Sequence, residues 1–276
     1  MGRYRYPLAI QTLLPDAYRG DSAFIANMKT LQKLGFDGVE LNIKDPQALN
    51  PQDLKQFLGD FGLGLFVFAT GFTAKTHNLS LAAADEARRK ESVRRAKEFL
   101  AFAAEFGAGA VAGFLKGAMG ENSAQNLACL KASAAEIAPE ALRLKTPFIV
   151  EAINRFESPL GNSLDEVWDI IKDVKNPYVH ILPDTWHMNI EESNMEAAMI
   201  RHRDHFIGFH LSDNNRFLPG FGALDFKKII GVLDALEYKG KVALEANLKG
   251  SFIDDVTKSM EYLAPLLAKT EELVPK

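Results

Sequence analysis

The stretch LQKLGFDGVELNI, from Leu31 to Ile43, carries the signal that decides the fold. Its first half ends an amphipathic helix at Gly35, because glycine readily adopts the left-handed conformation that closes a helix C-terminus. Its second half, GVELNI from Gly38, is a short apolar run that is typical of a strand. The stretch therefore predicts a helix followed at once by a strand. Glycines in AAEFGAG and LEYKGK predict the same arrangement elsewhere in the chain.

Seven further apolar runs share this character, and longer amphipathic segments such as DEARRKESVRRAKEFLAFAAEF and FKKIIGVLDALEYKG lie between the runs. Strands that alternate with helices predict a parallel sheet. Eight such units in a chain of 276 residues favour a closed (β/α)8 TIM barrel over an open doubly wound sheet. The seven other runs are LAIQTL from Leu8, LGLFVFAT from Leu63, AGAVAGFL from Ala108, PFIVEA from Pro147, YVHILPD from Tyr178, HFIGFHLS from His205 and KVALEAN from Lys241.

The rest of the chain adds no sign of a second unit. Neither of the glycine-rich phosphate turns, G-x-G-x-x-G or G-x-x-x-x-G-K-[ST], occurs in the sequence. No linker or low-complexity segment divides the chain, so we expect residues 1–276 to form one α/β domain.

Composition narrows the function classes. A formal charge of −4 and a pI near 5.9 argue against a nucleic-acid partner, which usually meets a basic face. The single cysteine, Cys129, excludes an internal disulfide and suits a reducing compartment. The start, MGRYRYPLAIQTLL, lacks the apolar core of a signal peptide, and no later stretch is long enough to span a membrane. We therefore expect a cytoplasmic protein without a membrane partner.

Four metal-competent side chains follow the last four predicted strands. Glu151 ends FIVE, Asp184 follows ILP, His210 lies in IGFH and Glu245 ends VALE. A barrel keeps its active site at the C-terminal ends of its strands, and neighbouring strands lie only about 4.8 Å apart. One acid at a strand end commonly caps a helix or pairs with a cation. Four candidate ligands on consecutive strands predict that the side chains converge on one metal site.

The donor set indicates the kind of metal. Three carboxylates and one imidazole form an oxygen-rich site that favours Mn²⁺, Mg²⁺ or Co²⁺ over a thiolate-bound structural zinc. A catalytic Zn²⁺ remains an alternative. His187 follows Asp184 by one short turn in ILPDTWHMNIEE, where it is either a fifth ligand or a donor to a substrate oxygen.

These motifs resemble the xylose-isomerase-like barrel superfamily of sugar isomerases and epimerases, and within it the ketose 3-epimerases of the D-tagatose 3-epimerase and D-psicose (allulose) 3-epimerase type. The resemblance rests on VEAINRFES, DTWHMNIEE, HLSDNNRFLPGFGALDF and the LE of VALEANL, all in the second half of the chain. The first half matches only in its barrel-like layout. The family commonly forms oligomers, which implies a homodimer or homotetramer.

The resemblance also implies roles for individual residues. One divalent metal ion, with Mn²⁺ as the first choice, would be held by Glu151, Asp184, His210 and Glu245. Glu151 and Glu245 would exchange protons with the substrate from opposite faces. The carbonyl and hydroxyl end of a sugar or sugar phosphate would contact Glu157, His187 and Arg216.

The implied reaction is epimerisation of a ketose at C3 through an enediolate, since a proton beside a ketone is weakly acidic. Aldose–ketose (or hydroxy-acid) isomerisation and polyol dehydration are alternatives on the same metal site. A DNA-repair endonuclease of this superfamily would need further ligands from the early strands, where His77 alone is a candidate. A barrel that only binds sugar would be expected to lack a ligand, and none of the four is missing.

The sequence leaves the roles of several other polar and aromatic residues undecided. Three could hold a phosphate or carboxylate of the substrate or lie on a solvated loop, which we favour: Lys75, His77 and Lys116. Four could wall a pocket, although most aromatic residues in such a fold belong to the core: Phe68, Phe114, Trp186 and Phe217. We expect structural roles for Glu40, His180, His202 and His205.

Overall fold

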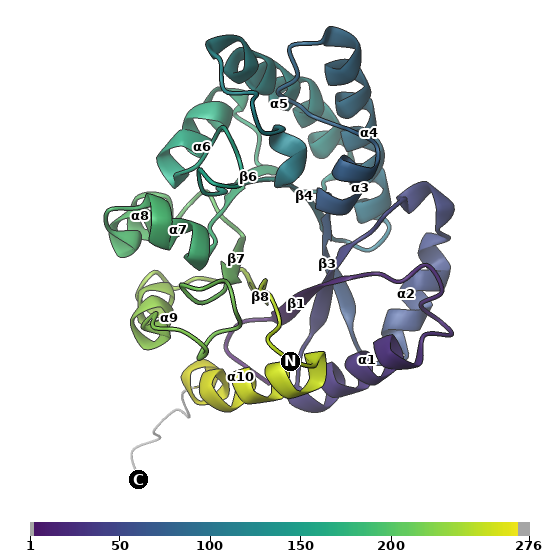
Figure 1. Ribbon diagram of the computed structural model, residues 1–276, viewed down its shortest axis with the longest axis vertical. Helices are drawn as coiled ribbons and strands as arrows, with labels where there is room; N and C mark the ends of the chain where they lie inside the picture. The colour runs from purple at the N-terminus through teal and green to yellow at the C-terminus, as the bar shows by residue number, and fades with distance from the viewer. Residues whose placement is uncertain (1–2, 270–276) are drawn as a thin grey trace.

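A computed structural model describes residues 3–269 and has eight parallel strands around a central axis (Figure 1). Each strand pairs with its neighbour in the order β6-β5-β4-β3-β2-β1-β8-β7. The predicted (β/α)8 TIM barrel is therefore confirmed. The strands are β1 (Leu8–Leu13), β2 (Gly38–Asn42), β3 (Gly64–Ala69), β4 (Gly109–Ala112), β5 (Phe148–Glu151), β6 (Val179–Leu182), β7 (Gly208–Leu211) and β8 (Lys241–Leu244).

The sheet closes between β6 and β7, where the ladder is least regular. Two isolated parallel bridges join these strands, Ile181 to Phe206 and Asp184 to His210. The backbone N–H of His210 donates to the carbonyl of Pro183 at 2.9 Å. This last bridge fixes two of the predicted metal ligands side by side.

Several strands are shorter than the apolar runs that predicted them. Only the middle of AGAVAGFL forms β4, because the backbone at Gly113 leaves the extended region and the chain enters the 3-10 turn η2 (Phe114–Lys116). Glu40 is the middle residue of β2. Asp184 begins a helix after β6, and Glu245 is the first residue after β8.

Helices surround the barrel and follow the strands along the chain (Figure 1). The predicted stop at Gly35 is confirmed, since its φ is 85° and its N–H donates to the carbonyls of Leu31 and Gln32. After α9, Glu237 and not Gly240 has the positive φ. The helices are α1 (Ser22–Leu34), α2 (Pro51–Gly59), α3 (Gly71–Thr76), α4 (Glu86–Ala104), α5 (Ala124–Leu144), α6 (Leu164–Ile171), α7 (Thr185–Glu191), α8 (Met195–Arg201), α9 (Phe226–Ala235) and α10 (Phe252–Leu267), with 3-10 turns η1 (Pro46–Ala48) and η3 (Lys172–Val174).

The hydrophobic core consists of a main cluster outside the ring of strands and a smaller cluster of side chains from the strands themselves. The main cluster lies between the strands and the helices, where Phe68 packs edge-on against Phe99 and Phe102 of α4. Of the two roles left open for Phe68, the structure shows the core position, because strand alternation turns the side chain outward. A smaller cluster, Val67, Val111, Ile149 and Leu182, comes from four neighbouring strands.

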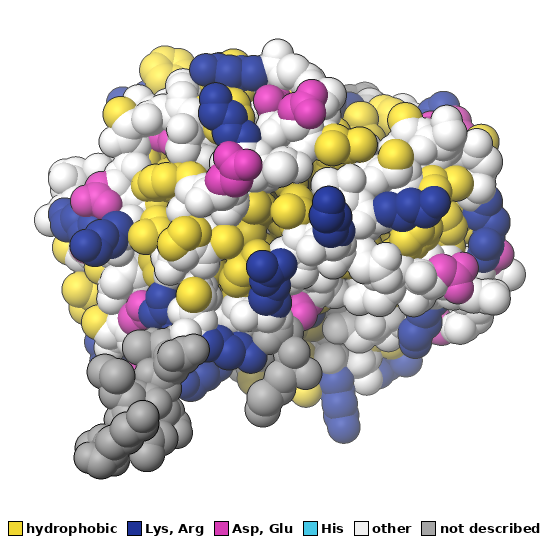
Figure 2. Space-filling view, turned by 90° about the horizontal axis from the view of Figure 1, so that it is seen from below, with side chains coloured by type: hydrophobic (Ala, Val, Ile, Leu, Met, Phe, Trp, Pro, Cys, Tyr) yellow, Lys and Arg dark blue, Asp and Glu magenta, His cyan; other side chains and the backbone are white. Residues whose placement is uncertain are grey.

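The helices and the outer surface indicate whether a membrane or a nucleic acid could be a partner. None of the helices within residues 3–269 is long and apolar enough to cross a membrane. On the face shown in Figure 2, Lys and Arg side chains are scattered among acidic and apolar ones and form no stripe. This face therefore lacks the basic track that a nucleic-acid partner needs. One domain over residues 1–276 stays a prediction, and residues 1–2 and 270–276 lie outside the described residues.

Candidate functional site

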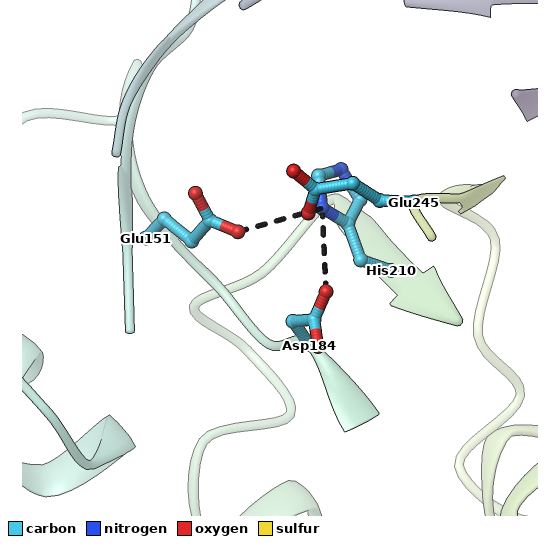
Figure 3. A group of neighbouring side chains, drawn as sticks. All are labelled: Glu151, Asp184, His210 and Glu245. Atoms are coloured by element: carbon cyan, nitrogen blue, oxygen red, sulfur yellow. Dashed lines mark hydrogen bonds and ion pairs between the residues drawn. The ribbon is translucent and has the colours of Figure 1, made fainter. Parts of the chain in front are cut away.

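The four predicted ligands meet at the C-terminal ends of β5 to β8 (Figure 3). One ligand atom from each of Glu151, Asp184, His210 and Glu245 lies within 4.8 Å of the others. Asp184 is also the N-cap of α7, because its side chain accepts from the backbone N–H groups of Trp186 and His187. The start of α7 thus fixes the orientation of this carboxylate.

The cluster centres on His210 Nδ1. Glu245 Oε2 lies 2.8 Å from this nitrogen, Glu151 Oε1 lies 3.5 Å away and Asp184 Oδ2 lies 3.9 Å away. Among the described residues, Glu151 Oε1 is buried and has no hydrogen-bond partner, since its ion pair with His210 at 3.5 Å is too long for one. A carboxylate oxygen left unpaired in the interior is costly unless an ion or a water satisfies it. Three carboxylates, one of them with an oxygen that accepts no hydrogen bond, and one imidazole fit a divalent cation that prefers oxygen ligands.

Gly113, just after β4, makes room for the cluster. A Cβ at this position would lie 2.6 Å from Glu151 Oε2, closer than real Cβ contacts allow. A larger residue there would therefore displace the Glu151 carboxylate. The sequence alone gave no reason to single out this glycine.

Glu40 supports His210 from the other side of the barrel. Its Oε2 lies 2.9 Å from His210 Nε2, and both side chains are buried. When Nε2 carries the proton and donates it to Glu40, Nδ1 is left to face the other three acids. The structural role expected for Glu40 is thus a specific one, and its partner, 170 positions away, could not be read from the sequence.

Electrostatics drive the pKa values of the two glutamates apart. Burial, followed by the charge of Glu245, raises the pKa of Glu151 to about 7. Burial would also raise the pKa of Glu245, but Arg216 and His210 outweigh it and hold that pKa well below 4.5. Carboxyl groups whose environments separate their pKa values are suited to opposite acid and base roles.

The pKa of His210 is likewise governed by its neighbours. Burial would lower it, but Glu40 and Glu245 raise it well above 6.5. Without a cation, His210 is therefore protonated near neutral pH. A cation that binds Nδ1 must displace that proton.

The three residues expected to contact the substrate line one cavity, which we call the site cavity. Its volume is about 40 Å³, and Glu157, His187 and Arg216 line it together with Glu151 and Glu245. A cavity of this size has room for no more than a few water molecules, since one water requires about 10–15 Å³ of such volume. The site cavity is thus nearly filled by its own side chains.

Arg216 lines this cavity and pairs with two of the candidate ligands. Its Nη1 lies 2.7 Å from Asp184 Oδ2, and its Nη2 lies 3.1 Å from Glu245 Oε2. Its guanidinium also stacks 4.7 Å from the ring centre of Trp186, which does not itself line the site cavity. Because Arg216 neutralises two of the candidate ligands, it competes with a cation for their oxygens.

His187 is held in one tautomer. The backbone N–H of Asn154 donates to His187 Nδ1 at 3.2 Å, and Asn154 Nδ2 lies 2.8 Å from the same nitrogen. Burial lowers the pKa of His187 to about 4, so the ring is neutral at pH 7. The proton then resides on Nε2, which makes His187 a donor toward the site cavity. Sequence reasoning missed the role of Asn154.

The three residues considered for an anion do not gather. Lys116 is fully buried and donates to the carbonyls of Glu151 at 2.7 Å and Gly161 at 2.8 Å. The solvated-loop interpretation of Lys116 is therefore wrong, and burial lowers its pKa to about 7. Lys75 and His77 are exposed on and just after α3.

The remaining candidates are divided between the site and the outer layer. Phe114 lines the site cavity, while Phe217 lies under the ammonium group of Lys249. His202 Nε2 pairs with Asp165 at 2.7 Å, and the ring of His205 stacks on Trp168 at 3.6 Å. Neither histidine lines the site cavity, and neither does His180, which lies in β6.

Comparisons with known proteins agree with this geometry. A family model described as xylose isomerase-like TIM barrel matches residues 28–266. A ketose 3-epimerase from Arthrobacter globiformis is 28% identical over 251 residues, which are 90% of this chain and 86% of that protein. A 3-dehydro-D-guloside 4-epimerase from Escherichia coli K12 is 35% identical over 109 residues, 40% of this chain and 42% of that protein. The solved structure of an L-ribulose 3-epimerase superposes with a TM-score of 0.82, 22% identity and 94% coverage of both chains.

Proposed function

The chain belongs to the xylose isomerase-like TIM barrel family, and from that premise we propose that it is a metal-dependent epimerase that inverts C3 of a ketose. The observation that carries the proposal is the convergence of Glu151, Asp184, His210 and Glu245 within 4.8 Å. The epimerase names of the relatives support the same reaction class.

The two glutamates supply the acid and the base. In Figure 3, Glu151 and Glu245 approach the cluster from opposite sides, as inversion at one carbon requires. One carboxylate removes the proton from C3 to give an enediolate, and the other returns a proton to the opposite face. In the reverse reaction the roles are exchanged.

Other residues bind and orient the sugar. His187 donates from Nε2 to a substrate oxygen, and Arg216 offers a guanidinium that remains charged throughout. Glu157, whose pKa is raised by burial, lines the same cavity. It accepts a hydrogen bond from a sugar hydroxyl when ionised and donates one to it when protonated. When bound at the four ligands, a divalent cation supplies polarisation of the neighbouring oxygens.

Mn²⁺ is the metal we propose, since three carboxylates and one imidazole suit it, with Mg²⁺, Co²⁺ and Zn²⁺ as alternatives. We also keep a cytoplasmic homodimer or homotetramer as part of the proposal. Light scattering on purified protein would measure the oligomeric state directly.

The test uses metal-stripped protein reconstituted with Mn²⁺ and incubated with ketoses in D₂O, with products followed by NMR. Deuterium at C3 together with the C3 epimer is the expected result. Deuterium at C1 or C2 with an aldose product would instead identify an aldose–ketose isomerase. Exchange or water loss only with cyclic polyols would identify a dehydratase.

The acid–base assignment has its own control. Glu245→Gln and Glu151→Gln should each bring turnover down by about 10²–10⁴-fold. The metal content of each variant must be measured alongside, so that loss of a proton-transfer group is separated from loss of the cation. A variant that keeps full turnover with normal metal content would refute the two-glutamate mechanism.

A further inference from the structure

A second cavity opens beside the site cavity, at the C-terminal ends of β1 and β8. We call it the β1/β8 cavity, and its volume is about 440 Å³. Four residues line both cavities: Gln11, Asn42, Arg216 and Glu245. A ligand bound in the small site cavity would therefore reach the larger cavity. The volume of the larger cavity lies in the range typical of small-molecule sites.

The walls of the β1/β8 cavity are apolar or neutral. Leu13 is 58% exposed and Leu248 is 41% exposed, and both line this cavity together with Phe252. Large apolar side chains held open to solvent beside a reactive site mark a contact surface for an apolar group. The two paired amides, Asn42 Nδ2 donating to Gln11 Oε1 at 2.7 Å, add neutral polar contacts for hydroxyl groups.

Charge argues against an anion in this cavity. Of its lining residues, only Arg216 and Glu245 are charged, and they already pair with each other at 3.1 Å. A phosphate placed here would meet no uncommitted cation among the described residues, and burying it would be unfavourable. The lining therefore favours a neutral occupant.

A cavity of about 360 Å³ on the opposite flank also fails to suit an anion. Its two cations are committed, since the ammonium of Lys75 lies 4.2 Å from the ring centre of Phe114 and Arg88 pairs with Glu121 at 2.7 Å. The carboxylate of Glu157 lines the same cavity and would repel a negative group.

We propose that the β1/β8 cavity binds a neutral, partly apolar substituent of the sugar, so that the substrate is a keto sugar capped away from its reacting carbon and not a sugar phosphate. This inference rests on the proposed epimerase function for the reacting end of the substrate. Leu13 and Leu248 contact the cap, and Gln11 and Asn42 bind the hydroxyls between the cap and the metal site.

The experiment compares four ketoses that differ only at O6: D-fructose, 6-O-methyl-D-fructose, 6-O-benzyl-D-fructose and D-fructose 6-phosphate. Proton exchange is measured in D₂O with the Mn²⁺-loaded protein. The benzyl sugar should have a kcat/KM at least about tenfold above that of the methyl sugar, and the phosphate should be the poorest substrate. The reverse order, with the phosphate best, would overturn the inference.

Two variants locate the effect. Leu248→Asp should reduce the benzyl-to-methyl preference about tenfold, because a charged group replaces the apolar contact. Leu142→Asp, the same change at an exposed leucine on α5, is the matched control and should keep the preference. An equal preference in both variants, or a wild-type ratio near one, would overturn the inference.

A binding measurement separates this inference from the proposed function. Phenyl β-D-glucopyranoside has no ketone and cannot react, so saturation-transfer NMR reports only whether its phenyl group touches the protein. If none of the four ketoses exchanges despite stoichiometric Mn²⁺, the proposed function fails. A phenyl signal that is present in the wild type and lost in Leu248→Asp would still support the neutral subsite, and an absent or unchanged signal would refute it.

Discussion

Glu40→Gln should weaken metal binding without disturbing the fold. Glu40 does not face the cation directly; it accepts a hydrogen bond from the far nitrogen of His210 at 2.9 Å. Its negative charge makes Nδ1 a better ligand and fixes the tautomer that exposes Nδ1. Glutamine has nearly the same size and retains an acceptor oxygen, so the variant removes the charge and little else.

The size of the effect follows from the hydrogen bond. A bond to a charged group contributes about 1.5–3 kcal/mol and a neutral one about 0.5–1.5 kcal/mol. The difference, about 1–1.5 kcal/mol, corresponds to a roughly tenfold change in Kd. Glu40→Ala leaves Nε2 buried without an acceptor and should weaken binding further, toward the roughly 100-fold upper range for such supporting residues.

The assay titrates metal-stripped protein with Mn²⁺ and measures free Mn²⁺ by electron paramagnetic resonance. Glu40 also raises the pKa of His210, so removing its charge weakens the competing proton as well. The deficit of Glu40→Gln should therefore be greatest at about pH 9 and should shrink toward about pH 6. Glu121→Gln, which changes a largely buried acid bonded to Arg88, is the matched control and should leave Kd unchanged at both pH values. A Kd for Glu40→Gln within twofold of wild type at high pH, or a deficit independent of pH, would refute the reasoning.

Three further predictions concern the ligand cluster and the residues that line the site cavity. Arg216→Ala should bind Mn²⁺ more tightly than wild type in the absence of sugar, because it frees Asp184 Oδ2 and Glu245 Oε2, while it raises KM for the sugar; weaker Mn²⁺ binding would contradict the competition. The affinity of the wild type for Mn²⁺ should rise by about tenfold per pH unit while His210 remains protonated in the metal-free protein, and calorimetry in buffers of different ionisation enthalpy should detect the released proton. Burial holds the pKa of His187 at about 4 in the folded protein, against 6.5 when unfolded. The unfolded state therefore binds the extra proton first, and metal-free protein should lose about 3 kcal/mol of stability through this group as the pH falls from 6.5 to 4, a loss that denaturant titration should find absent in His187→Gln.

The sequence by itself determined the layout and the position of the site along the chain. Helix stops such as Gly35 and short apolar runs depend on neighbouring residues only, so the alternation of strands and helices could be read locally. The convergence of Glu151, Asp184, His210 and Glu245 was likewise predictable, because parallel strands in a barrel all end at the same rim.

Only the tertiary structure decided how these groups are supported. Glu40 and His210 lie on strands that are distant in sequence, and they meet because the barrel closes. The burial of Lys116, a lysine expected on a solvated loop, follows from the carbonyls of Glu151 and Gly161 that surround its ammonium group. Such contacts depend on closure, register and shared volume across the whole barrel. The local hydrophobic pattern does not predict these quantities, whereas it does indicate which residues begin and end each strand.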